Sequence, residues 1–417
     1  MGNLRRTNMK DWFEYYREVC PICQNTGGCL INGKGDTVVC IRVNSEVQFS
    51  KRFPSWIHKL NNKRAIKPSE DATYGDFISG QKKLDPNELD SIYSSLLEIL
   101  SLTDNHYSHL SGPKREMSDI EIECRGYKSF PVRPWEKARK LKALLKVDSF
   151  SGTPGFYENK FGWSLAGREG ILIPYRNEFN KVIGFQIRID NPPNDLKIDP
   201  GSISGLQARV KEQPNLVQIL VDGEIIDEKR LELKKTQLVH HENKTGTLTL
   251  VKGKRYFWLS SANKENGTGA GDPMPIHVAI PTHKLKNWNK GEILKTNAVW
   301  ITEGALKADI AVEHIHRVYS NNELKDLGDT IIATAGVNVW RTALPVLENM
   351  GVKNVNLAFD MDAMQNPKVA YFIKEMAVEL HKQNYHVNLV LWNIKDGKGI
   401  DDIFIQRKSP KIKPLIN

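Results

Sequence analysis

The sequence predicts an α/β protein with a small cysteine-rich domain at its N-terminus and a basic α+β region in the middle. Three observations lead to this prediction. Four of the five cysteines lie between Cys20 and Cys40, strand and helix patterns alternate over residues 298–417, and all of the excess positive charge lies before that segment. With 417 residues, 40% apolar and 26% charged, the chain is long enough for two or three domains with buried cores.

The N-terminal domain is expected over residues 1–55, where the cysteines follow the pattern Cys-x2-Cys-x5-Cys-x10-Cys. A Cys-x2-Cys pair lets two thiolates reach one ion at about 2.3 Å, the distance found in tetrahedral zinc sites. A domain of this size buries little apolar surface, so a bound metal would supply much of its stability. We therefore predict a structural zinc ion held by Cys20, Cys23, Cys29 and Cys40. The alternative is four reduced cysteines that cluster by chance; the isolated Cys124 is expected in a core.

A polar linker is expected at 56–88, followed by a basic α+β region at 89–297. Helical periodicity predicts helices at Pro86–Leu102, Ser118–Gly126 and Pro134–Leu145. From Gly170 the pattern changes to two short strands, GILIPYRN and KVIGFQIRID, joined by a turn at Asn177–Lys181. The segment near 191–252 is predicted to be a β-rich insertion without a chemical motif.

The C-terminal domain is expected over residues 298–417. Four apolar strands, AVWIT, TIIATAG, VNLAFD and HVNLVLW, are separated by helical segments that include GALKADIAVEHIH, NVWRTALPVLENM and PKVAYFIKEMAVELHKQ. Strands that alternate with helices predict a Rossmann-like parallel sheet that is covered by helices on both faces.

The charge is distributed unevenly along the chain. The whole sequence has 59 Lys and Arg against 49 Asp and Glu, whereas residues 298–417 contain 14 of each kind. The first 297 residues therefore carry the entire excess of ten positive charges. A basic body joined to a neutral, acid-bearing end is what an enzyme that handles a polyanion needs, although a generally basic surface is the simpler alternative.

Acidic residues follow two of the predicted parallel strands. Glu303 stands where AVWIT gives way to a helix, and Asp360 and Asp362 stand at the end of VNLAFD. The carboxyl ends of parallel strands meet at one edge of a sheet, where ligands bind in open α/β folds. Carboxylates gathered there predict a site for a hard divalent cation that keeps positions open for phosphate oxygens. The alternative is that these residues only cap helices.

The segments VWITEGALKADIA and VNLAFDMDA resemble the TOPRIM domain that bacterial-type primases share with topoisomerases and some nucleases. Glu303 with Gly304 matches the first motif of that family, and Asp360 and Asp362 match its Asp-x-Asp motif. The later GKGIDDIF is similar to a motif that follows in primases. The secondary acidic and basic candidates are Lys307, Lys398, Asp401 and Asp402.

The order of a four-cysteine ribbon, a basic middle region and a TOPRIM segment also resembles bacterial primases. GFYENKFGWSLAGREGILIPYRN, GFQIR and KRYFWLSS look like a primase-like family common in phages, plasmids and integrative elements. The resemblance covers most of the chain outside 191–252. It departs from replicative primases in its all-cysteine zinc ligands and in lacking a recognisable helicase-binding region.

The resemblance implies synthesis of short oligonucleotide primers on single-stranded DNA by metal-dependent nucleotidyl transfer, in the replication of a mobile element. Asp360 and Asp362 would hold Mg2+ or Mn2+, with Glu303 as a ligand or general base. A separately encoded replicative helicase is an expected partner. Template and nucleoside triphosphates would bind Arg176, Arg188, Lys254, Arg255, Trp258 and Lys264.

Two other functions compete with this one. A TOPRIM nuclease would use the same metal ions to hydrolyse a phosphodiester, but the cysteine ribbon and the lack of an attached ATPase argue against it. A non-catalytic DNA-binding accessory protein would keep the ribbon and retain the carboxylates without using them. No Gly-x4-Gly-Lys-Ser/Thr motif occurs, which excludes a P-loop helicase motor in this sequence. No apolar run is long enough for a membrane span and the first residues lack a signal segment, so we expect a cytoplasmic protein.

Overall fold

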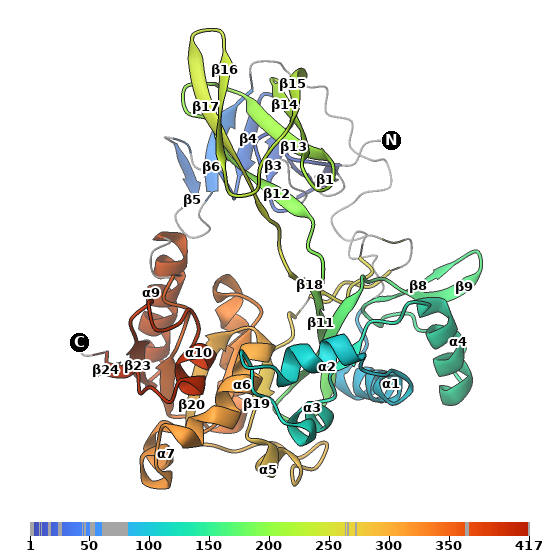
Figure 1. Ribbon diagram of the computed structural model, residues 1–417, viewed down its shortest axis with the longest axis vertical. Helices are drawn as coiled ribbons and strands as arrows, with labels where there is room; N and C mark the ends of the chain where they lie inside the picture. The colour runs from blue at the N-terminus through green and yellow to red at the C-terminus, as the bar shows by residue number, and fades with distance from the viewer. Residues whose placement is uncertain are drawn as a thin grey trace. The chain divides into compact units, whose positions relative to one another are not determined.

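The computed structural model describes residues 4–7, 9, 11–15, 18–23, 27–43, 45, 47–50, 55–60, 82–262, 264, 267–271, 273–362 and 367–415. The chain forms two compact units. One consists of Met1–Ser79 with Pro192–Lys254, and the other of Gly80–Asn191 with Arg255–Asn417 (Figure 1). Most of the linker predicted at 56–88 lies outside the described residues. None of the described helices has the length and apolar character needed to cross a membrane.

The first unit contains an antiparallel six-stranded sheet in the order β1-β2-β3-β4-β6-β5. Its core consists of Leu4, Tyr15, Ile31 and Val38 together with three of the clustered cysteines. The strand of this sheet that comes last in the sequence, SWIHK, pairs with β4, so the sheet continues past residue 55. The strands are β1 (Leu4–Arg6), β2 (Trp12–Tyr15), β3 (Leu30–Asn32), β4 (Thr37–Cys40), β5 (Gln48–Ser50) and β6 (Ser55–Lys59).

The β-rich segment predicted near 191–252 is present and belongs to the first unit. It forms two three-stranded antiparallel sheets, β12-β17-β16 and β13-β14-β15, around a shared apolar core that includes Val217, Ile219 and Leu248. Gln207 of this segment donates a hydrogen bond to the carbonyl of Pro21, 3.0 Å away. The strands are β12 (Asn194–Asp199), β13 (Leu206–Glu212), β14 (Leu216–Val221), β15 (Glu224–Arg230), β16 (Thr236–His241) and β17 (Lys244–Lys252).

The second unit begins with four helices and two small sheets. α1 buries one face that includes Leu89, Tyr93 and Leu96, against β11 and α4. Asp85 caps this helix, and Ser118 caps α3 in the same reciprocal way. The elements are α1 (Pro86–Ile99), α2 (Asp104–Ser111), α3 (Asp119–Arg125), β7 (Lys128–Ser129), α4 (Pro134–Leu145), β8 (Phe156–Asn159), β9 (Gly162–Leu165), β10 (Gly170–Arg176), β11 (Val182–Ile189) and β18 (Tyr256–Trp258).

Three helices and the β10–β11 hairpin were predicted in this region, and all are present. α2 was not predicted, because its sequence DNHYSHLS has no clear apolar period and Thr103 makes no side-chain cap. The hairpin belongs to an antiparallel sheet in the order β18-β11-β10-β7.

The second unit also contains a six-stranded sheet in the order β19-β21-β20-β22-β23-β24. The four predicted strands are its parallel centre. The sheet is nevertheless mixed rather than all parallel, since β19 and β24 pair antiparallel at its two edges. These short edge strands carry too few residues to show a sequence period. The strands are β19 (His277–Ala279), β20 (Ala298–Glu303), β21 (Ile331–Thr334), β22 (Asn354–Leu357), β23 (His386–Leu391) and β24 (Lys411–Pro414).

Helices cover both faces of this sheet, as predicted. Val299, Ile301 and Val355 pack with α8 and α9 on one face, whereas Trp300 and Ile331 pack with α6 and α10 on the other. Alternate residues of one strand point to opposite faces, so a continuous apolar run such as AVWIT satisfies both layers. The helices are α5 (Thr282–Leu285), α6 (Ala305–His314), α7 (Asn321–Leu327), α8 (Leu344–Met350), α9 (Pro367–Lys382) and α10 (Ile400–Ile405).

One predicted helix in this layer is wrong in part. The segment NVWRTALPVLENM forms a 3-10 turn, η2 (Val337–Ala343), followed by α8. Pro345 lies in the first turn of α8, where its missing N–H is tolerated, and Val339 departs from helical geometry within η2.

Candidate functional site

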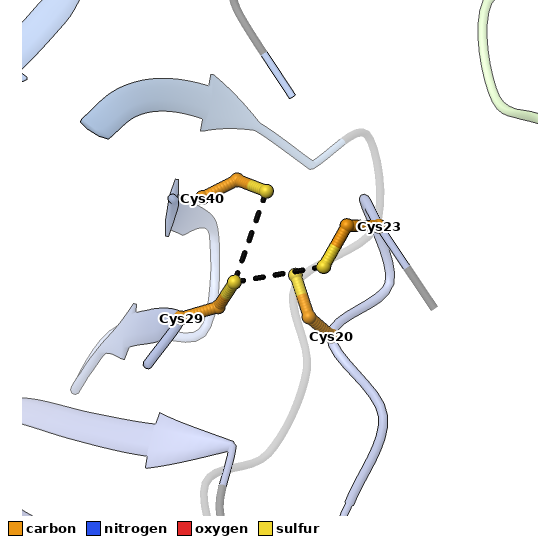
Figure 2. A group of neighbouring side chains, drawn as sticks. All are labelled: Cys20, Cys23, Cys29 and Cys40. Carbon is orange, nitrogen blue, oxygen red and sulfur yellow. Dashed lines mark hydrogen bonds between the residues drawn. The ribbon is translucent and has the colours of Figure 1, made fainter. Parts of the chain in front are cut away.

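The four clustered cysteines converge on one point in the first unit (Figure 2). Their sulfur atoms all lie within 4.8 Å of one another, with 3.6 Å between Cys23 and Cys29 and 3.8 Å between Cys29 and Cys40. Four sulfurs at about 2.3 Å from a tetrahedral zinc ion lie about 3.8 Å apart. The cluster therefore has the donor type, number and spacing of a structural zinc site, as its sequence pattern predicted.

Hydrogen-bond donors surround the sulfurs. The backbone N–H groups of Arg42 and Val43 both donate to Cys40 Sγ at 3.3 Å. Arg42 Nη1 lies 3.5 Å from Cys29 Sγ and 3.6 Å from Cys23 Sγ. Such contacts stabilise thiolates, which is the protonation state that binds a metal.

The crowding of the sulfurs supports the same assignment. Hydrogen bonds with Cys23, Cys29 and Cys40, together with burial, raise the pKa of Cys20 far above its usual value. A bound dication would reverse this preference, because it offsets the negative charge that the thiolates bring together. The residues therefore fit zinc, and four thiolates would leave it no open position for chemistry.

A second group of polar residues lies at the carboxyl ends of two adjacent parallel strands. β20 ends at Glu303, and its parallel neighbour β22 leads into the segment that holds Asp360 and Asp362. Gly304 follows Glu303 with φ of +89°, a backbone conformation that favours glycine, and turns the chain into α6. The fold thus brings to one sheet edge the three acidic residues that the sequence nominated.

Two lysines hold the aspartates of this group. Lys307 Nζ, from the first turn of α6, lies 2.6 Å from Oδ1 and 2.5 Å from Oδ2 of Asp360. Lys398 Nζ lies 2.8 Å from Asp362 Oδ2 and 3.7 Å from Asp360 Oδ2. The backbone N–H of Met361 also donates to the carbonyl of Lys398, which ties the two loops together. We call Glu303, Asp360, Asp362 and Asp401, with Lys307 and Lys398, the carboxylate centre.

Asp401 enters the centre beside Gly399. A Cβ atom at Gly399 would lie 2.3 Å from Asp401 Oδ1 and 3.3 Å from Asp360 Oδ1, so a larger residue there would have to displace the Asp401 carboxylate. Asp401 Oδ1 is buried and has no hydrogen-bond partner among the described residues. Burial raises the pKa of Asp401 to about 7. The positive charge of Lys307 lowers this pKa, whereas the negative charges of Asp402 and Asp360 raise it further.

Asp402 has a structural role. Its Oδ2 accepts hydrogen bonds from the backbone N–H groups of Lys398 at 2.9 Å and Gly399 at 3.1 Å. It therefore caps α10 and fixes the loop that carries Lys398. The structure gives Asp402 this capping contact, whereas the sequence had nominated it only as a secondary site residue.

Glu303 keeps an accessible side chain, but the surrounding protein partly desolvates its carboxylate. This desolvation raises the pKa of Glu303; Lys307 and Lys398 oppose the shift, whereas Asp360 and Asp362 add to it. A glutamate with a raised pKa at a ligand-binding edge is suited to exchange a proton.

The donor set fits a magnesium or manganese ion held by few protein ligands. Among the described residues, only the four cysteines bring three or more potential ligand side chains within metal-binding distance of one another. Mg2+ is often held by one or two carboxylates together with substrate phosphates. Asp360 and Asp362, separated by one residue and both contacted by Lys398, match that pattern.

A cluster of arginines lies elsewhere in the second unit. The Arg188 side chain is only 8% exposed, yet its guanidinium makes no hydrogen bond to any described residue and lies 4.0 Å from its nearest ion partner, Asp190 Oδ1. The other oxygen of Asp190 is held by His106 Nε2 at 2.8 Å. No nitrogen of Arg188 is among the enclosed, unpartnered atoms of the described residues, so its donors reach solvent and are open to an anionic ligand.

Arg115, Arg255 and His109 complete this arginine cluster. Burial and the charges of Arg115, Arg188 and Arg255 lower the pKa of His109 to about 4, so its ring is neutral near pH 7. His109 Nε2 and Arg115 Nε are buried and have no hydrogen-bond partner in the described part of the chain. The sequence had nominated Arg188 and Arg255. His109 lies in the unpredicted helix α2, and Arg115 follows that helix. Neither was nominated, because no local sequence pattern links them to β11.

The other predicted nucleic-acid contacts have different surroundings. The guanidinium of Arg176 faces the carbonyls of Cys124 and Arg125 and the side chain of Asn180, so the protein itself occupies its donors. Lys254 is exposed at the end of the first unit. Lys264 is exposed and its Nζ lies 5.3 Å from the centre of the Tyr157 ring. Cys124 is half-buried and packs against the core of the large sheet.

Trp258 is part of a core rather than a free stacking platform. Its ring lies 4.6 Å from that of Tyr175, and both belong to an apolar cluster that includes Ala305 and Leu306 of α6. The neighbouring Tyr256 and Phe257 are 42% and 39% exposed. This packing holds β18, next to Arg255, against the helix that starts at the carboxylate centre.

Comparisons with known proteins give limited similarity. A family model described as a domain of unknown function (DUF3854) matches residues 291–411. No curated protein matches the chain. The chain is similar to the zinc-binding and RNA polymerase domains of the Aquifex aeolicus primase, with 11% identity, a TM-score of 0.42, and coverage of 98% of this chain and 81% of that one.

Two further solved structures are similar to a comparable extent. The RNA polymerase domain of Mycobacterium tuberculosis primase DnaG has 12% identity and a TM-score of 0.42, covering 79% of this chain and 85% of that one. A DnaG primase catalytic domain bound to single-stranded DNA has 12% identity and a TM-score of 0.38, covering 78% and 80%. The function of this chain therefore has to be argued from its own side chains.

Proposed function

We propose that this chain is a TOPRIM-type primase that joins nucleotides into short primers on single-stranded DNA, in the replication of a phage, plasmid or integrative element. The observation that carries this proposal is the carboxylate centre: acidic residues that end or follow two adjacent parallel strands lie at one sheet edge, and two lysines pair with its aspartates. The TOPRIM motifs at Glu303, Asp360 and Asp362 supply the reaction class, and the cysteine cluster agrees with the domain order of bacterial primases.

Asp360 and Asp362 would hold Mg2+ or Mn2+, which would activate the attacking hydroxyl and neutralise charge on the phosphates. Glu303, whose pKa is raised, would accept the proton of that hydroxyl. Lys398, whose side chain is 60% exposed, can leave Asp362 and contact an incoming phosphate. Asp402 would keep Lys398 in reach by fixing its loop.

The arginine cluster would bind phosphates of the triphosphate or of the template. Arg188 offers a guanidinium that no described residue hydrogen-bonds, with Arg115 and Arg255 nearby and one carboxylate, Asp190, to offset them. Exposed Tyr256 and Phe257 would contact bases next to these charges. A separately encoded helicase would deliver single-stranded template.

The test is incubation of the zinc-loaded protein with single-stranded DNA, labelled nucleoside triphosphates and Mg2+ or Mn2+, followed by separation on a denaturing gel. New labelled oligonucleotides that depend on the template are the expected result. A shortened template without new product would instead identify a nuclease. Template that is bound in a mobility-shift assay but remains unchanged would identify a non-catalytic accessory protein.

A further inference from the structure

The ion pair between Lys307 and Asp360 is the tightest contact in the carboxylate centre. One ammonium group spans both oxygens of one carboxylate, at 2.6 and 2.5 Å. The Asp360 side chain is 9% exposed and that of Lys307 is 30% exposed. The Lys307 stem also passes beneath Gly399, where an added Cβ would lie 3.4 Å from Lys307 Cδ. The pair is thus shielded from solvent and confined by its neighbours.

The helix that carries Lys307 is fixed in place two residues further on. Asp309 is 1% exposed and accepts hydrogen bonds from Tyr127 at 2.6 Å and from His277 Nε2 at 3.0 Å. It also forms an ion pair with the buried Arg125, which in turn pairs with Glu313. These contacts anchor α6, the helix from which Lys307 reaches Asp360.

Lys398 contrasts with Lys307 in its freedom to move. It contacts Asp362 from a loop, and its side chain is 60% exposed. Solvent competes with such a contact, so an arriving dication can displace this ammonium at small cost. The centre therefore has one fixed positive charge, on Lys307, and one that can leave.

The fixed charge bears on how many metal ions the centre can take. In two-metal sites the cations lie about 3.5–4 Å apart and share carboxylate ligands between them. Here both oxygens of Asp360 face an ammonium, so a second dication beside Asp360 would meet a like charge at short range. A cation that takes the place of Lys398, next to Asp362 Oδ2 and Asp360 Oδ2, lies on the side away from Lys307 and reduces that repulsion.

We propose that the carboxylate centre takes one divalent cation, and that Lys307 provides the second positive charge which a second metal ion would otherwise supply. This inference rests on the proposed function for its substrate: the Lys307 ammonium would face the same phosphate group as the metal ion. Lys307 is therefore a specificity-determining residue for metal stoichiometry.

The experiment counts Mn2+ ions by electron paramagnetic resonance and isothermal titration, using the full zinc-loaded chain. The occupancy of the centre is the difference between the wild type and the D360N/D362N double variant, which corrects for ions bound elsewhere. One ion per chain is expected for the wild type. Two ions, or none, would overturn the inference.

Two substitutions of Lys307 provide further tests of the number of bound Mn2+ ions. Lys307→Asp is expected to raise the occupancy from one ion to two, because a carboxylate replaces the ammonium. Lys307→Met keeps an apolar stem and should tighten Mn2+ binding about tenfold, since Asp360 loses its competing cation. If the Asp variant fails to fold, as judged by circular dichroism, the Met variant decides. Unchanged Mn2+ affinity with a lowered melting temperature would assign Lys307 a merely structural role and overturn the inference.

The matched control is Lys395→Met, an exposed lysine of the same unit, which should leave both count and affinity unchanged. Primer synthesis measured in parallel separates this inference from the proposed function. One bound ion without synthesis would contradict the function and keep the stoichiometry. Primer synthesis with two bound ions would support the function and contradict the proposed stoichiometry.

Discussion

The ring of Trp258 lies 4.6 Å from the ring of Tyr175, with an angle of 57° between the two planes. This contact joins β18 to the apolar cluster under the start of α6. The strand that follows Arg255 is thereby held in a fixed relation to Glu303, which immediately precedes that helix.

Replacement of Trp258 by alanine should therefore lower stability more than it lowers nucleic-acid binding. Removal of the half-buried ring leaves a cavity, and we expect the free energy of unfolding to fall by about 2 kcal/mol. Trp258→Phe should lose less than about 1.5 kcal/mol, because it keeps an aromatic ring in the cluster. Chemical denaturation and single-stranded DNA titrations measure the two effects. Tyr371→Ala, at an exposed aromatic position on α9, is the control. A stable Trp258→Ala protein with greatly weakened DNA binding would instead show that Trp258 contacts nucleic acid directly.

The cysteine cluster predicts one zinc ion per chain. Cys23→Ser removes one of four ligands and should leave well under one zinc per chain by elemental analysis. Because structural zinc contributes on the order of 10 kcal/mol to small domains, the first unit should then become sensitive to limited proteolysis while the second stays protected. Cys124→Ser, outside the cluster, should keep its zinc. A full complement of zinc in the Cys23→Ser protein would show that the cluster is not the metal site.

The arginine cluster predicts a phosphate contact at Arg188. Arg188→Gln removes a guanidinium that makes no hydrogen bond to any described residue. The substitution should therefore weaken ligand binding without leaving a protein hydrogen-bond partner unpaired. We expect triphosphate or single-stranded DNA affinity to fall about tenfold, and a change of about one in the salt dependence if the lost contact is to DNA phosphate. Arg168→Gln, at an exposed position, is the matched control. Equal affinities of the two variants for both ligands would show that Arg188 contacts neither.

The raised pKa of Asp401 predicts a pH-dependent stability. Its folded-state pKa of about 7 lies above the ordinary value of 3.8, so the folded protein binds this proton more tightly than the unfolded chain does. The stabilisation is fully present below about pH 4 and is lost as the pH rises through 7, with an upper bound on the order of 4 kcal/mol. Asp401→Asn cannot ionise, so between pH 5 and 8 it should lose less stability than the wild type. Denaturation curves without added Mg2+ test this, and the same pH slope in both proteins would contradict it.

Much of the fold could be predicted from local patterns. The four central strands are long apolar runs, and the 12-residue helix Pro134–Leu145 starts at a proline, so both appear at the predicted positions. The edge strands β19 and β24 could not be predicted, because three or four residues show no period and their pairing depends on the completed sheet. Pro345 and Val339 split a predicted helix through backbone geometry that the apolar spacing alone does not reveal.

The site was predictable in kind but not in its contacts. Strand-end positions brought Glu303, Asp360 and Asp362 to one edge, because that edge is a property of parallel strands. The ion pair between Lys307 and Asp360 joins residues 53 positions apart and depends on how α6 packs. The same holds for the arginine cluster, whose members come from α2, the segment after it, β11 and the residue before β18. Trp258 could not be assigned from sequence, because a short aromatic run fits a core and a stacking surface equally well; in the structure it packs against Tyr175.

The central claim is that the carboxylate centre performs metal-dependent nucleotide addition, and the rate of template-dependent primer synthesis by Asp360→Asn tests it most directly. Asparagine keeps the shape of the side chain but removes the charge that a hard cation needs. We expect synthesis to fall by at least a hundredfold, while the protein stays folded and its zinc content and single-stranded DNA affinity stay near those of the wild type. Asp326→Asn, at an exposed position on α7, should remain fully active. A folded Asp360→Asn protein that makes primers at the rate of the wild type would contradict the account.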